Sequence, residues 1–156
     1  MAINLENIIF VGIVSAVNAS DGTVIAVRPD KDNRTTKALH VLQRGTKQSK
    51  DFWLPAVGDQ VLCVVLPNMS GSGPADGFVV GAFYSDVDTA PSRASASTRV
   101  LDHAGDLIMN IGGTLKIKAG TLDIAGGGDV VASGISLTGH VHGGVKAGGD
   151  STGGPQ

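Results

Sequence analysis

The chain has little of several residue types, and each shortage excludes a class of protein. It has one cysteine, Cys63, among 156 residues, so neither an intrachain disulfide nor a thiolate-rich metal site can form. Aromatic residues make up 4% of the chain and charged residues 17%, and the formal net charge is −2. Bulk electrostatics therefore give no reason to expect a nucleic acid or an anionic membrane as partner. No apolar run reaches the roughly 20 residues that a membrane-spanning helix needs.

What the chain does have is glycine. The 23 glycines favour an all-β, turn-rich protein with small side chains over a helical one. Residues 1–7 lack the basic region of a secretory signal, so we expect synthesis and folding in a reducing cytosol. Cys63 lies inside an apolar run and is expected to be a buried, inert thiol.

The first part of the chain, residues 1–86, is typical of a small barrel. The strands that we predict there are Ile8–Val17 (with Gly12 as a bulge or bend), Thr23–Arg28, Leu39–Gln43, Phe52–Leu54, Val61–Leu66 and Gly77–Tyr84. Asp21-Gly22 is a strong hairpin signal between the first two strands. About five strands with uneven loops predict an oligonucleotide/oligosaccharide-binding (OB) type of barrel. Residues 87–99 are poor in large apolar side chains and are typical of a linker.

The pattern changes in residues 100–139, which carry a short-period β repeat. Gly113, Gly120, Gly127 and Gly134 recur every seven residues. Between them stand apolar residues two apart: Leu107, Met109 and Ile111, then Leu115 and Ile117, then Leu122 and Ile124. About 40 residues of this kind cannot close a core, and their edges carry unpaired backbone groups. Three copies wound about one axis can pair every edge, so we predict an intertwined trimeric β-helix. The alternative is a segment that packs on its own barrel.

The motif with the most chemical content lies in residues 140–156, predicted to be a metal-binding apex. His140 and His142 are two apart, and residues i and i+2 of a strand point to the same face, so both can reach one metal ion. Gly139, Gly143 and Gly144 flank the pair and allow backbones to crowd. Three copies of the pair supply six imidazole nitrogens. Zn prefers four ligands, so a six-histidine site favours Fe, with Ni or Zn less expected, at one ion per trimer. Such a site has no open position and is structural, not catalytic.

The remaining histidines, His40 in a predicted strand and His103 near the start of the repeat, are expected to be ordinary packed or exposed residues.

Taken together, the chain resembles the baseplate assembly protein V family, the central spikes of contractile phage tails, which are related to the spike tips of type VI secretion and R-type bacteriocins. The resemblance rests on residues 55–61 and 77–81 of the barrel, on the Gly-broken repeat, and on the ending 139–144 followed by 152–156. It implies a homotrimer with an OB-fold collar, a β-helix, and an apex that holds iron through His140 and His142 of each chain. It also implies that the collar attaches to the baseplate hub and tail tube, and that contraction drives the apex through the envelope of the target cell.

From this we expect a structural, cell-puncturing spike in a virion or bacteriocin particle, without enzymatic activity. Two alternatives stay open. One is an OB-fold protein that binds single-stranded nucleic acid, because seven of the 12 basic residues fall between Arg28 and Lys50, ahead of Phe52-Trp53. Asp30, Asp32 and Asp51 dilute that charge, so we expect no nucleic-acid partner. The other is a metalloenzyme using His140 and His142, for which Asp150 is the nearest downstream acid.

Overall fold

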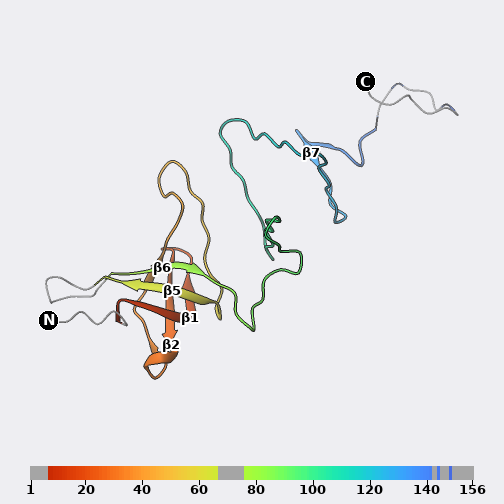
Figure 1. Ribbon diagram of the computed structural model, residues 1–156. Coiled ribbons are helices and arrows are strands. Elements are labelled where there is room, and N and C mark those ends of the chain that lie inside the picture. The colour runs from red at the N-terminus through yellow and green to blue at the C-terminus, as the bar shows by residue number, and fades with distance from the viewer. Residues whose placement is uncertain (1–6, 67–75, 142–143, 145–147, 149–156) are drawn as a thin grey trace. The chain divides into compact units, whose positions relative to one another are not determined.

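The computed structural model describes residues 7–66, 76–141, 144 and 148. The chain divides into two compact units, residues 1–106 and 107–156, and each is described by itself (Figure 1). Among the described residues there is no helix of the length and hydropathy needed to cross a bilayer.

The first unit contains a five-stranded barrel, labelled in part in Figure 1. Its strands are β1 (Ile9–Asn18), β2 (Thr23–Arg28), β4 (Leu39–Val41), β5 (Gln60–Val65) and β6 (Gly77–Ala82). A short strand β3 (Arg34–Thr35) pairs with β2 after the 3-10 turn Pro29–Lys31. The pairing runs β1-β5-β6-β4-β2, and β2 also pairs with β1, so the sheet closes on itself. The prediction of an all-β chain with a five-stranded barrel is confirmed.

Strand β1 closes the barrel because it serves two partners. Its first half, Ile9–Ile13, pairs with β5, and its second half, Ile13–Asn18, pairs with β2. All barrel pairings are antiparallel except β4 with β6, which is parallel. A sheet closed in this way leaves no long edge to aggregate. Five strands are also the number expected for the predicted OB type of barrel.

The barrel core follows the two-residue period of the strands. In β1, Phe10, Gly12 and Val14 are buried and the residues between them are exposed. The core residues as a group are Phe10, Val14, Val24, Ala26, Leu39, Val41, Val61, Cys63 and Val79. Cys63 is fully buried, as expected, and burial raises the pKa of its thiol to about 11.

Glycine 12 is not the bulge that the sequence predicts. The register of β1 against β2 shifts between Val14 and Ala16, so the extra residue is Ser15. Gly12 instead marks a close approach, because a Cβ there would lie 2.9 Å from the Cβ of Ala26 in β2. The expected irregularity exists in this strand, but three residues later, and the glycine is needed for packing.

The predicted strand Phe52–Leu54 is also wrong. The backbone of Trp53 is hydrogen-bonded to the Gln43 side chain and not to a neighbouring strand. Its N–H donates to Gln43 Oε1 at 3.0 Å, and its carbonyl accepts from Gln43 Nε2 at 2.9 Å. One amide side chain thus satisfies both backbone groups of Trp53 and removes the need for a ladder partner. The turn at Asp21-Gly22 is as predicted, with Gly22 at φ +69° between β1 and β2.

The outer face of β1, β5 and β6 is apolar; it is exposed at Ile9, Val11 and Leu62 and half-buried at Val64 and Phe78. Ile9, Val64 and Phe78 are paired side by side across the three strands, and Val11 is paired with Leu62. Ile9 is 52% exposed and Val11 45%. The three strands contain no Lys, Arg, Asp or Glu. A strand that is apolar on both faces is typical of one that is covered on both faces, and the barrel interior covers only one.

The second unit has little regular structure within one chain. Residues 107–130 form no strand, and the hairpin of β7 (Val131–Ala132) and β8 (Ile135–Ser136) follows. The apolar residues of the predicted repeat are exposed, from 52% for Ile111 and Leu115 to 65% for Leu107. The predicted β-helix depends on pairing between chains, so it stays a prediction.

Candidate metal centre

The candidate centre follows a short hairpin. Val131 pairs with Ser136 and Ala132 with Ile135. The two residues between the strands, Ser133 and Gly134, both have positive φ, 51° and 82°. Positive φ at both central positions defines the turn type whose twist suits a two-residue hairpin. The backbone N–H of Leu137 then donates to the Val130 carbonyl at 2.9 Å and extends the pairing by one step.

A carboxylate continues the pairing where the backbone ladder stops. Asp129 Oδ1 accepts hydrogen bonds from the backbone N–H of Thr138 at 3.2 Å and from its hydroxyl at 2.9 Å. The hydrogen bond from the Ser136 side chain, followed by those from Thr138, holds the pKa of Asp129 below its ordinary value. The carboxylate is therefore ionised at neutral pH and ties the two ends of the hairpin together.

His140 is fixed by a backbone carbonyl. Its Nδ1 lies 2.8 Å from the Ser136 carbonyl oxygen. A carbonyl only accepts, so Nδ1 carries the hydrogen and, in the neutral ring, Nε2 carries the lone pair. A metal-bound histidine usually donates its other ring N–H to a carbonyl or carboxylate in this way. The residues present therefore fit a metal ligand at His140.

The rest of the predicted ligand set is not placed. His142 lies outside the described residues, and so does Asp150 of the enzymatic alternative. Within the part of the chain that the structure describes, no group of three or more metal-binding side chains comes together. The other histidines behave as expected: His40 packs in β4 with its ring centroid 6.2 Å from that of Phe78, and His103 is exposed.

The sequence did not single out Asp129, Ser136 or Thr138. The hairpin itself has a signal, because Ser133-Gly134 between alternating apolar residues is a turn dipeptide. The contact between Asp129 and Thr138 spans nine residues and follows from the hairpin register, which the repeat spacing alone does not give.

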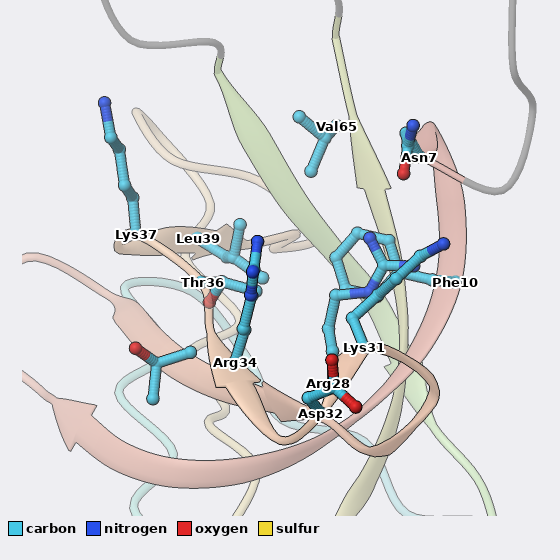
Figure 2. Close-up of a pocket in the computed structure, with 11 residues that line it drawn as sticks. Asn7, Phe10, Arg28, Lys31, Asp32, Arg34, Thr36, Lys37, Leu39 and Val65 are labelled. Atoms are coloured by element: carbon cyan, nitrogen blue, oxygen red, sulfur yellow. The ribbon is translucent and has the colours of Figure 1, made fainter.

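The barrel carries a pocket of about 550 Å³ with a basic rim (Figure 2). Its lining includes Arg28, Lys31, Arg34 and Lys37 together with Phe10. The Arg28 guanidinium stacks 4.0 Å from the centre of the Phe10 ring and pairs with Asp30 at 2.6 Å. Phe10 is buried, so its face is covered by Arg28 and is not offered to a nucleic-acid base.

The aromatic residues of the nucleic-acid hypothesis are Phe52 and Trp53. Phe52 is 61% exposed, whereas Trp53 is used internally. It packs against the barrel core, and its indole Nε1–H donates to the Leu42 carbonyl at 3.1 Å. Arg44, from the same basic stretch, pairs with Asp51. These contacts give the barrel no stacking platform at Phe10 or Trp53.

A comparison with known families finds a match at the end of the chain. Residues 134–156 match the family model described as GpV Apex motif. The matched stretch begins at the hairpin turn and contains both His140 and His142. No curated protein matches the chain.

Proposed function

We propose that this chain is a baseplate spike protein like those of the family whose apex motif it matches at residues 134–156, and that it is the mechanical piercing tip of a contractile tail. The match to that motif supports a place in a phage tail baseplate. The finer proposal has three parts: a homotrimer, a stiff β-helix formed between the three chains, and an apex closed by one iron ion that His140 and His142 of each chain bind. The proposal assigns no catalytic step to any residue.

The observation that carries the proposal is the apolar surface of residues 107–124. Seven of its residues are 52–65% exposed in the single chain: Leu107, Met109, Ile111, Leu115, Ile117, Leu122 and Ile124. Large apolar side chains exposed in this number along one segment mark an interaction site. The seven-residue spacing of the glycines repeats the same side-chain pattern along the segment, as a partner with the same repeat requires. A second and third copy of the chain meet that requirement.

The mechanical role follows from the pairing that such a trimer makes. When three chains wind about one axis, every strand edge is bonded to a neighbour, and bending the rod breaks hydrogen bonds on every face. From Gly143 onward the sequence is dominated by Gly, Ala, Ser and Thr, which suit a narrow tip. The metal supplies a cross-link between three chain ends where few apolar residues remain. His140, with Nδ1–H held by Ser136, presents Nε2 for that role.

The experiment that tests piercing compares assembled particles. Particles carrying the double change His140→Ala/His142→Ala should assemble and contract but kill or infect target cells less than wild type. His103→Ala is the matched control, because it removes an exposed histidine from the other unit. Equal killing by the double variant and by the control, with the metal shown to be lost, contradicts a metal-closed piercing tip.

The apolar outer face of β1, β5 and β6 supports the attachment of the collar to the baseplate hub. Its exposed Val11 and Leu62 lie side by side, and no charged residue interrupts the three strands. We expect Val11→Glu to abolish co-purification with the hub protein and to leave the trimer intact. Val57→Glu, at a 66% exposed valine outside the strands, is the control. Loss of the trimer in Val11→Glu would assign this face to contacts between copies instead.

A further inference from the structure

We propose that Asp129 is a positioning residue for the apex metal: its carboxylate holds the end of the β7–β8 hairpin so that His140 presents Nε2 from a fixed place and in one tautomer. This inference rests on the proposed metal-binding role of His140. Asp129 is 11 positions before His140 in the chain and lies before the segment that the family motif covers.

The first step of the argument is the closing contact of the hairpin. The last backbone step joins the Leu137 N–H to the Val130 carbonyl. Beyond it the Asp129 carboxylate takes the place of a backbone acceptor and binds Thr138 through both its N–H and its hydroxyl. Bonds from N–H and O–H groups to an ionised carboxylate are roughly twice as strong as those between neutral groups. Thr138, two residues before His140, is therefore tied to the base of the hairpin.

The second step runs through Ser136. Its Oγ lies 2.6 Å from the backbone nitrogen of Gly139, whose N–H donates to it. An oxygen lone pair of the hydroxyl therefore faces Gly139. The hydroxyl thus fixes the residue next to His140, and Asp129 fixes Thr138, the residue before that.

The third step reaches the ring itself. The Ser136 carbonyl accepts the Nδ1–H of His140 at 2.8 Å. Ser136 therefore holds Gly139 by its side chain and His140 by its backbone, while Asp129 holds Thr138, which lies between Ser136 and Gly139 in the chain. Replacing the partner that orients a metal-bound histidine typically weakens metal binding about 10–100-fold. Asp129 acts one bond further out, but it acts once in each chain, so we expect a loss of at least about 10-fold for a metal bound by three copies.

The test uses the full chain loaded with cobalt(II) as a spectroscopic probe. Asp129→Asn keeps the size of the side chain and removes its charge. Asp123→Asn is the matched control, since Asp123 lies in the same unit and its replacement removes the same negative charge. We expect Asp129→Asn to release cobalt to a chelator at least about 10-fold faster than the control at neutral pH. We also expect the paramagnetically shifted Nδ1–H signal of His140 to exchange faster with solvent. The control should match wild type in both measurements.

Two outcomes separate the inference from the function on which it rests. If wild type binds no metal, the proposed metal site fails and the inference fails with it. If wild type binds metal and Asp129→Asn keeps the release rate and the N–H signal of the control, only the inference is overturned. Should Asp129→Asn fail to assemble, Thr138→Val removes one of its hydrogen bonds and leaves the other. That variant should release the metal faster than the control, and an unchanged rate would overturn the proposal.

Discussion

Ile117 gives the sharpest test of the proposed association of residues 107–124. It is 62% exposed in the single chain. Burying a whole isoleucine side chain is worth roughly 1.5–3 kcal/mol, so covering the exposed part is worth roughly 1–2 kcal/mol per chain. A trimer contains three copies, and Ile117→Ala should therefore cost it roughly 3–6 kcal/mol in total. Since 1.4 kcal/mol is a factor of ten, the association constant should fall by roughly two to four orders of magnitude.

Ile108 provides the matched control. It is the same residue type, 74% exposed, and it alternates with Leu107 and Met109, so in a strand it points to the opposite face. We expect Ile108→Ala to change association little. The measurement is sedimentation of both variants over a series of concentrations and mild urea. If the segment stays exposed and does not associate, both variants will have an association free energy within about 0.5 kcal/mol of wild type. That result would refute the proposed association.

Three further predictions concern the barrel and the apex. Gly12→Ala should lower the free energy of unfolding of the barrel by about 1–3 kcal/mol because the added Cβ meets Ala26. Gly81→Ala should lower it less, because nothing lies within 4 Å of a Cβ at that position. Urea unfolding followed by Trp53 fluorescence compares the two variants, and equal losses of stability would contradict the close approach at Gly12. Cys63, buried and with its thiol pKa raised to about 11, should react with a thiol reagent at pH 8 only after unfolding, and rapid labelling of the folded chain would contradict its burial. Removal of the proposed metal with a chelator at neutral pH should increase proteolysis after residue 139 and leave the barrel folded, because this metal would join only the chain ends. Loss of barrel structure on chelation would contradict this prediction.

The acid response of the hairpin depends on Asp129. Its pKa is lowered in the folded chain, so the stability it contributes is complete above its ordinary value of 3.8 and is lost as the pH falls through the lower folded value. The proposed metal requires neutral imidazole, and an unperturbed imidazole takes up a proton at a higher pH than a carboxylate does. The hairpin contacts should therefore outlast the metal during acidification. Amide exchange of Thr138, followed together with metal content, checks this order, and earlier loss of the Thr138 protection would contradict it.

The barrel could be predicted from the sequence because turn residues bound the apolar, β-rich runs that form its strands. Strand β2, Thr23–Arg28, has the predicted bounds, and β1 is displaced by one residue at each end. The errors occurred where a side chain or a close contact replaced a local rule. Gln43 satisfies the backbone of Trp53, and the space beside Ala26 explains Gly12. Both effects depend on residues distant in the sequence, which local patterns do not report.

The site was predictable only in part, for a different physical reason. His140 and His142 stand out because two imidazoles two residues apart suit a metal, and the GpV Apex motif covers them. The residues that orient His140 do not stand out, since Asp129 and Ser136 are common surface residues and become partners only through the hairpin register. The β-helix remains a prediction because its strands would find their partners in other copies, and in the single chain their apolar residues are exposed.

The most direct test of the account is the native mass of the purified protein measured together with its metal content. Because each chain supplies two histidines and one apolar face, we predict a mass of three chains and one iron ion per assembly. The same sample after acid treatment and return to neutral pH in chelator should keep the barrel and lose the ion. A stable single chain that binds no metal would contradict both the intertwined spike and the apex that closes it.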